Sequence, residues 1–201
     1  MITTVISDLG NVLLHYNSEQ AYGQLGMLAG RSPAEVRQII YTPELEHAFN
    51  KGLMTQGEYF RKCSQALGLN CGYAKFVDTW VDNFSPNDNV ISGLKKLKGK
   101  YRLALLSNIN ILHFEHVREK FPAEIGLFNQ LILSYKVHMR KPEPGIFMLA
   151  LHNLGEKPEA CLFIDDKLGN VEVARSLGMR AEVYSKDSDF EAILKQNGVL
   201  V

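Results

Sequence analysis

Charged and hydroxyl side chains follow several short apolar stretches of this chain. They are Asp8, the pair Ser107 and Asn108, Lys141 within the segment 140–143, and the pair Asp165 and Asp166. If these side chains came together in the fold, three carboxylates, a hydroxyl and a lysine would surround one cavity. Carboxylates so close together repel by roughly a few kcal/mol per pair and stay ionised only beside a cation. Oxygen ligands with water in the remaining positions suit Mg²⁺, and a lysine and a hydroxyl beside that ion suit a phosphoryl group.

Each of these residues also has an ordinary structural explanation when it is taken alone. A lone aspartate in a turn usually shapes that turn. Ser107, Asn108 or either residue of the acidic pair could cap a helix. A lysine before proline is usually a solvated charge. The order of the residues, and their shared place after apolar stretches, favour the joint chemical interpretation.

The apolar stretches before these residues predict strands. We expect strands over residues 3–7, 102–106, 131–134, 161–164 and 180–184. Apolar residues at helical spacing predict the intervening helices, which end near Gly99, Lys120, Gly155 and Gly178. Strands alternating with helices predict a parallel sheet covered on both faces. Ligands of such sheets bind beyond the carboxyl ends of the strands, where the candidate residues are expected.

Residues 17–84 carry helix signals in place of this alternation. Ser32-Pro33-Ala34-Glu35 and Thr55-Gln56-Gly57-Glu58 are capping-box patterns. A helical stretch of this length within a strand–helix alternation predicts an inserted subdomain. We therefore assign residues 1–14 and 86–201 to the α/β core and residues 15–85 to a helical cap.

The composition is that of an ordinary globular protein. Of 201 residues, 46% are hydrophobic, and 22 basic residues balance 22 acidic ones. This balance argues against nucleic acid as the main partner, and no apolar run approaches the roughly 20 residues of a membrane span. The N-terminus has no basic flank, so we expect no signal peptide. The three cysteines, Cys63, Cys71 and Cys161, form no metal-ligand pattern and are odd in number, which favours a cytoplasmic location. The sequence leaves the oligomeric state open.

The candidate residues, read in order, match a known set of motifs. Asp8-Leu9-Gly10-Asn11-Val12, Ser107-Asn108, Lys141-Pro142 and Asp165-Asp166 with Asn170 resemble the four motifs of the haloacid dehalogenase-like (HAD) hydrolase superfamily. The resemblance covers the whole chain, including the inserted helices. Within the superfamily, the stretches 8–12 and 139–147 and the cap segment 49–60 are similar to the branch of bacterial glucose-1-phosphate phosphatases. The expected fold is a Rossmann-like, doubly wound parallel sheet with an inserted helical cap.

The resemblance implies a role for each motif residue. Asp8 would be the nucleophile that forms an aspartyl-phosphate, and it would bind Mg²⁺ through its other oxygen. The Gly10 carbonyl and the Asp166 side chain would complete the protein ligands, with Asp165 a further ligand or a support for them. Asn170 would orient a metal-bound water. Ser107 and Asn108 would bind the phosphoryl oxygens, and Lys141 would neutralise their charge. These roles imply a Mg²⁺-dependent phosphatase of a small phosphorylated metabolite, such as a sugar phosphate.

Gly10 departs from the pattern of most phosphatases in the family. They carry an aspartate there as general acid and base, a role worth about 10²–10⁴-fold in rate. We expect its absence to favour substrates with good leaving groups, such as an anomeric sugar oxygen or an aryl phosphate. His15, close by in the sequence, is a candidate substitute acid.

Three other functions compete with the phosphatase. A 2-haloacid dehalogenase uses the same aspartate without a metal, but such enzymes lack the acidic pair Asp165-Asp166. A receiver domain combines similar groups but is shorter, places its acidic pair first and has no inserted cap. A non-catalytic Mg²⁺-binding scaffold is permitted by Gly10.

Several other residues invite interpretation. His113 and His116 could share a metal, but no further ligand supports them and a solvated helix face is the preferred explanation. Phe76, Trp80 and Phe84 form a helical stripe that is typical of a core. Met139 and Arg140 could line the entrance to the site.

Overall fold

The central sheet consists of parallel strands in the order β5-β4-β1-β6-β7. The computed structural model describes residues 1–200, and all statements about its elements refer to them. The strands are β1 (Thr4–Ser7), β4 (Arg102–Ser107), β5 (Gln130–Leu133), β6 (Cys161–Asp165) and β7 (Arg180–Val183). The five expected strands and the α/β fold class are confirmed, with strand boundaries displaced by one residue at most.

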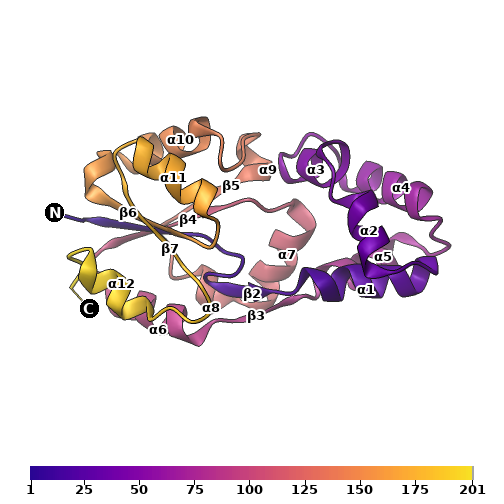
Figure 1. The fold of residues 1–201 in the computed structure, drawn as a ribbon, viewed down its shortest axis with the longest axis horizontal. Coiled ribbons are helices and arrows are strands. Elements are labelled where there is room, and N and C mark those ends of the chain that lie inside the picture. Colours follow the sequence, from indigo (N-terminus) through magenta and orange to yellow (C-terminus); the bar gives the residue numbers. More distant parts are fainter. Residues whose placement is uncertain (201) are drawn as a thin grey trace.

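Helices cover both faces of this sheet, because its strands carry apolar side chains on both faces. Val5 and Leu105 belong to one apolar cluster, whereas their neighbours Ile6 and Ala104 belong to the other. Helices α10 and α11 pack on the second face, and Figure 1 shows them on the opposite side of the sheet from α6, α8 and α12. The helices of this sheet lobe are α6 (Asp88–Leu97), α7 (Ile111–Lys120), α8 (Pro122–Ile125), α9 (Ser134–Val137), α10 (Pro144–Leu154), the 3₁₀ turn Pro158–Ala160, α11 (Leu168–Ser176) and α12 (Phe190–Gln196).

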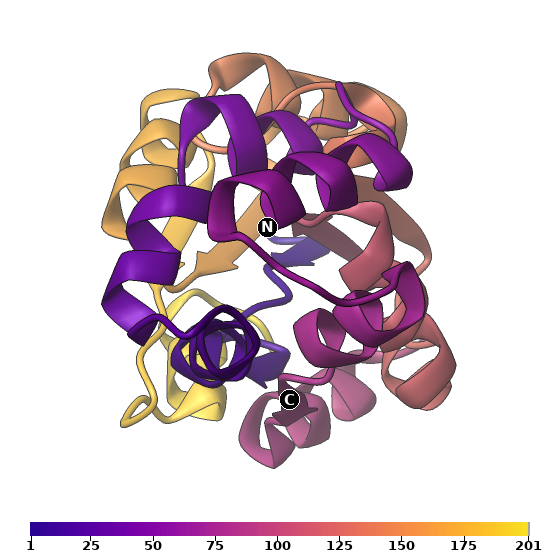
Figure 2. The ribbon, with the colours of Figure 1, turned by 90° about the vertical axis from the view of Figure 1, so that its right-hand side faces the viewer.

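Residues 18–81 form a second, helical lobe (Figures 1 and 2). Its elements are α1 (Ser18–Ala29), α2 (Pro33–Ile40), the π-helical turn Pro43–His47, α3 (Ala48–Asn50), α4 (Gln56–Leu67) and α5 (Tyr73–Val81). Both expected capping boxes form, at Ser32 and at Thr55. The lobe has its own apolar core, which includes Tyr59, Phe76 and Trp80, so Phe76 and Trp80 of the expected aromatic stripe are packing residues. Phe84 was wrongly placed on the same helix: it lies on a strand over residues 84–86 and packs in the core of the sheet lobe.

A short antiparallel ribbon joins the two lobes. Strands β2 (Leu14–Tyr16) and β3 (Phe84–Pro86) pair with each other, and neither was predicted from the sequence. Three-residue strands are too short to produce a readable alternation of apolar and polar residues. The proposed domain boundaries at residues 15 and 85 fall inside this ribbon.

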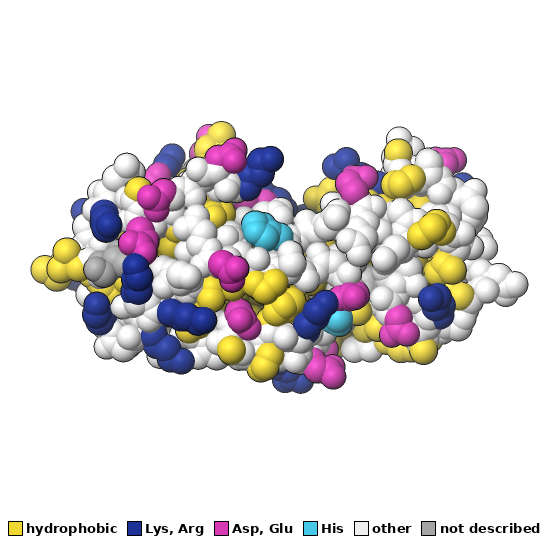
Figure 3. Space-filling model, turned by 90° about the horizontal axis from the view of Figure 1, so that it is seen from below, with side chains coloured by type: hydrophobic (Ala, Val, Ile, Leu, Met, Phe, Trp, Pro, Cys, Tyr) yellow, Lys and Arg dark blue, Asp and Glu magenta, His cyan; other side chains and the backbone are white. Residues whose placement is uncertain are grey.

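The surface carries no sign of charge segregation on the face drawn in Figure 3, where basic and acidic side chains are interspersed over both lobes. Within residues 1–200, no helix combines the length and the apolar character needed to cross a membrane.

Candidate active site

The predicted site residues gather where the parallel strands end. Asp8 follows β1, the central strand, and Asp165 ends β6 beside it. A cavity of about 300 Å³ opens at this edge, between the sheet lobe and the helical lobe. Its lining includes the predicted residues Asp8, Gly10, Asn108, Lys141, Asp166 and Asn170.

Lys141 is the centre of the charge arrangement. Its side chain is 1% exposed, and its Nζ lies 2.8 Å from Asp8 Oδ1 and 2.6 Å from Asp165 Oδ2. Burial disfavours the ammonium, but the two carboxylates outweigh it and raise the Lys141 pKa. Lys141 therefore carries its positive charge inside the site.

The backbone of Lys141 is held by Asn108. The amide nitrogen of the Asn108 side chain donates to the Lys141 carbonyl, and the Lys141 N–H donates to Asn108 Oδ1, both at 2.8 Å. This two-way bond joins the loop after β4 to the loop before α10. Ser107 is buried at the end of β4 and, among residues 1–200, is not part of the cavity lining. Contact of Ser107 or Asn108 with a phosphoryl group therefore stays a prediction.

Both side-chain oxygens of Asp165 accept hydrogen bonds from neighbouring residues. Its Oδ1 accepts from the Lys167 N–H and from the Asn170 side-chain amide, both at 2.8 Å, while Oδ2 accepts from Lys141. Burial opposes its charge, yet Lys141 and these donors lower the Asp165 pKa. This arrangement favours the expected supporting role of Asp165, which holds the lysine in place, and it assigns the Asn170 side chain to Asp165.

The three carboxylates lie close enough together to hold a divalent cation, with Asp8 and Asp166 as the better ligands because both oxygens of Asp165 already accept hydrogen bonds. One oxygen each of Asp8, Asp165 and Asp166 lies within 4.8 Å of the others. Asp166 Oδ2 accepts from the Asn11 side chain at 3.1 Å, whereas its buried Oδ1 has no hydrogen-bond partner within the described residues. Burial raises the Asp8 pKa to about 7, against the pull of Lys141. A nearby cation would favour the charged form of Asp8, so hard oxygen ligands that suit Mg²⁺ are in place.

The helical lobe supplies residues that sequence reasoning missed. Tyr22, Arg37, Tyr41, Glu46 and Asn50 line the cavity from the side facing the strand ends, together with Asn11 and Lys167 from the sheet lobe. Arg140 lines it as expected. Asn11, with φ +59°, also accepts the Tyr16 N–H. The missed residues lie on amphipathic helices and turns, where a polar side chain gives no signal that it faces a ligand.

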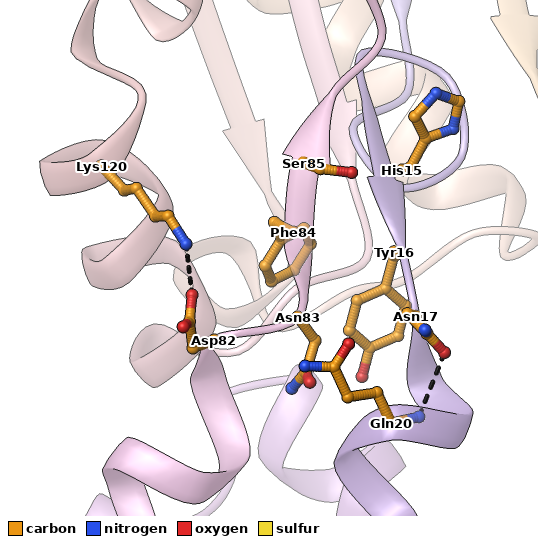
Figure 4. Close-up of a pocket in the computed structure, with 9 residues that line it drawn as sticks. All are labelled: His15, Tyr16, Asn17, Gln20, Asp82, Asn83, Phe84, Ser85 and Lys120. Atoms are coloured by element: carbon orange, nitrogen blue, oxygen red, sulfur yellow. Dashed lines mark hydrogen bonds and ion pairs between the residues drawn. The ribbon is translucent and has the colours of Figure 1, made fainter.

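His15 lies away from this cavity. It is exposed and lines a separate hollow beside the ribbon, together with Asn83, Ser85 and the ion pair of Asp82 with Lys120 (Figure 4). In Figure 4 the side chains of His15 and Tyr16 leave strand β2 in different directions. Tyr16 lines the active-site cavity, and the alternation of a strand turns its neighbour away.

The interpretation of His113 as part of a solvated face was wrong. The side chain is buried between the lobes, where its Nε2 is 3.0 Å from the Trp80 carbonyl and its Nδ1 is 3.1 Å from the Asn110 side-chain amide. Burial lowers the His113 pKa to about 4. His113 is therefore a neutral histidine that donates through Nε2. His116 faces Asp82 instead, at 3.4 Å, so the two histidines do not converge on a metal.

The comparison with known families decides the identity. Residues 2–178 match the haloacid dehalogenase-like hydrolases. The chain belongs to this family. The predicted family and its hydrolase class are confirmed.

Two curated relatives of this hydrolase match it over most of both chains. A D-ribitol-5-phosphate phosphatase of Bacteroides thetaiotaomicron is 25% identical over 188 residues, which are 89% of each chain. The sesquiterpene phosphatase astK of Aspergillus oryzae is 32% identical over 87% of this chain and 85% of its own. The drimenol cyclase drtB of Aspergillus calidoustus is 27% identical over 95% of this chain, which spans only 35% of that protein.

Solved structures of HAD family enzymes share the fold. A Bacteroides thetaiotaomicron enzyme in complex with magnesium and inorganic phosphate superposes with a TM-score of 0.84 and 25% identity over 96% of this chain and 99% of its own. The L-2-haloacid dehalogenase of Xanthobacter autotrophicus has a TM-score of 0.67 and 18% identity over all of this chain and 85% of its own, which shows the fold alone.

Proposed function

We propose that this HAD hydrolase is a Mg²⁺-dependent phosphatase of a small phosphorylated metabolite, with a sugar phosphate as the first candidate substrate. The observation that carries the proposal is the buried Lys141, which bridges Asp8 and Asp165 beside Asp166 in a cavity between the lobes. Relatives that are phosphatases, and a structural neighbour that holds magnesium and phosphate, support it.

In the proposed reaction, a carboxylate oxygen of Asp8 attacks phosphorus. The bond from phosphorus to the leaving oxygen breaks, and the leaving oxygen takes a proton from water because Gly10 offers no acid. A second water then attacks the aspartyl-phosphate, which releases phosphate and returns the Asp8 carboxylate. Lys141 holds positive charge against Asp8 and the transferring group. Asp165 keeps that ammonium in place through its 2.6 Å contact. Mg²⁺, held by Asp8, Asp166 and the Gly10 carbonyl, would supply charge neutralisation for the phosphoryl oxygens.

The test is phosphate release from para-nitrophenyl phosphate by wild type and Asp8→Asn, each with Mg²⁺ and with EDTA. We expect turnover that requires Mg²⁺ and falls by more than about 10³-fold in Asp8→Asn, because the amide is not a nucleophile. Asp187→Asn, an exposed change, is the control. Equal turnover by Asp8→Asn and wild type would refute the assignment.

The same assay addresses the competing functions. Metal-independent halide release from 2-haloacids would indicate the dehalogenase, whose fold this chain shares. Metal binding without any turnover would indicate the scaffold. We also propose a reducing, cytoplasmic setting, supported by the three cysteines, which form no disulfide within the described residues.

A further inference from the structure

The cavity lining is mainly polar, with apolar surface from the rings of Tyr16, Tyr22 and Tyr41. Every side chain that lines the cavity within residues 1–200 carries a polar group, and Gly10 has no side chain to add. A hydrocarbon chain placed here would strip water from these groups and offer them no hydrogen bonds in return, at a cost in free energy. The lining is therefore suited to a leaving group that itself makes several hydrogen bonds.

Glu46 is the distinctive member of this lining. It lies on the π-helical turn, is 8% exposed, and has no cation within 4.0 Å in the described part of the chain. One long hydrogen bond reaches it, from the Tyr22 hydroxyl to Oε2 at 3.4 Å, and the nearby Asn50 side chain also favours its charged form. A carboxylate has about four acceptor positions, and buried polar atoms are rarely left unpaired. Glu46 thus has acceptor capacity that the protein does not use.

The charged residues around Glu46 limit which chemical groups a ligand can place beside it. Arg37, Arg140 and Lys167 share the cavity with Glu46. Burial raises the Glu46 pKa to about 7, against the hydrogen bonds of Tyr22 and Asn50 and the charges of Lys167 and Arg140. These cations disfavour an amine in the same space. Hydroxyl groups suit both Glu46 and the basic residues, because a hydroxyl can donate to Glu46 and accept from an arginine or lysine.

We propose that Glu46 is the specificity residue of this site and that it accepts a hydrogen bond from a hydroxyl of a polyhydroxylated leaving group, so that the substrates are sugar or alditol phosphates and not isoprenoid phosphates. This inference rests on the proposed phosphatase function. The cavity of about 300 Å³ is at the small end for ligand sites, as a short polyol requires.

The experiment compares kcat/KM for ribitol 5-phosphate, methyl phosphate and farnesyl phosphate, with Mg²⁺ present. Wild type is expected to prefer the polyol phosphate to both others. Glu46→Leu is expected to lower the ratio of kcat/KM for ribitol 5-phosphate over methyl phosphate by about 10- to 100-fold, because the polyol loses its hydrogen bond to the carboxyl group. Glu46→Gln keeps one acceptor oxygen and should lose less.

Matched variants separate specificity from folding. Glu44→Leu changes an exposed carboxylate on the same turn and should leave the ratio as in wild type. Tyr22→Phe removes the one hydroxyl that holds Glu46, and it should lower the ratio by a few-fold even if Glu46→Leu fails to fold. An equal loss on ribitol and methyl phosphates, or a wild-type preference for farnesyl phosphate, would overturn the role of Glu46 while leaving the phosphatase intact. Absence of turnover with all three substrates and with para-nitrophenyl phosphate would overturn both.

Discussion

Lys141 shows how a single residue ties stability to function. A buried ammonium costs several kcal/mol of desolvation, which its partners must offset. Here Asp8 and Asp165 do so at 2.8 and 2.6 Å. A core built only for stability would gain as much from an apolar side chain of similar volume. The charge is therefore best explained by the chemistry at Asp8.

Gly10 leads to a prediction at the same scale. A Cβ added there would meet only Tyr16 Cβ, at 3.9 Å, so a side chain can begin at this position without a clash. Because the family's usual acid would then face the cavity, we expect Gly10→Asp to raise kcat/KM for methyl phosphate relative to para-nitrophenyl phosphate by about 10-fold or more. Gly10→Asn has the same size without the acid. An identical ratio in both variants would contradict the proton-transfer explanation.

At the scale of elements, helix α7 joins the lobes through His113. Its ring stacks on Trp80 of helix α5, with ring centroids 5.3 Å apart, and it donates to the carbonyl of the same residue. Asn110 caps the helix by accepting the His113 N–H, and its side-chain amide donates to Asn50 of helix α3. One helical turn of α7 thus anchors two elements of the helical lobe.

His113 makes the fold sensitive to acid. Burial lowers its pKa to about 4, against about 6.5 in the unfolded chain, so only the unfolded state takes up a proton between these values. Its contribution to stability is complete above pH 6.5 and is lost as the pH falls towards 4, by about 2 kcal/mol at pH 5.

Urea unfolding at pH 8, 6.5 and 5 tests this prediction. His113→Gln is expected to be less stable than wild type at pH 8, where packing is lost, but to lose less stability on acidification. The exposed His152→Gln is the control. Parallel pH dependences of wild type and His113→Gln would show that another group is responsible.

At the scale of the whole molecule, the cavity exists because the two lobes touch. Ser134 Oγ donates to the Asn50 carbonyl at 2.5 Å, and Lys51 Nζ lies 3.0 Å from Glu143 Oε1. Gly52 has φ +66°, and a Cβ on it would lie 2.1 Å from the Tyr135 carbonyl oxygen. The helical lobe therefore docks on helix α9 through direct backbone approach.

Gly52→Ala should push the lobes apart. We expect a loss of about 2–4 kcal/mol in unfolding free energy, a larger radius of gyration in small-angle scattering and weaker phosphatase activity. Gly68→Ala is matched in backbone strain, with φ +72° but open space around it, and should cost about 1 kcal/mol with no change in shape. Equal effects of the two substitutions would show that the contact with Tyr135 is unimportant.

Much of the sheet lobe could be predicted because its signals are local. Each strand is a short apolar run followed by a turn, and the long helices have apolar stripes, with a glycine near the ends of α6, α10 and α11. The ribbon of β2 and β3 was missed because each strand has only three residues, too few for a readable pattern, so that only the pairing of the two strands defines them. The burial of His113 was missed for a related reason, since its partner Trp80 belongs to a different lobe.

The candidate site also combines features that the sequence predicts with features that only the tertiary structure decides. The order of Asp8, Lys141 and Asp165-Asp166 along the chain determined the family and the strand-end position of the chemistry, because parallel strands bring their carboxyl ends to one edge. Only the tertiary structure decided that Asp165 binds Lys141, that His15 lies outside the active-site cavity, and that Glu46 lines that cavity. A side chain's direction and partners depend on how two lobes dock, and that docking is fixed by contacts between distant residues which no local pattern records.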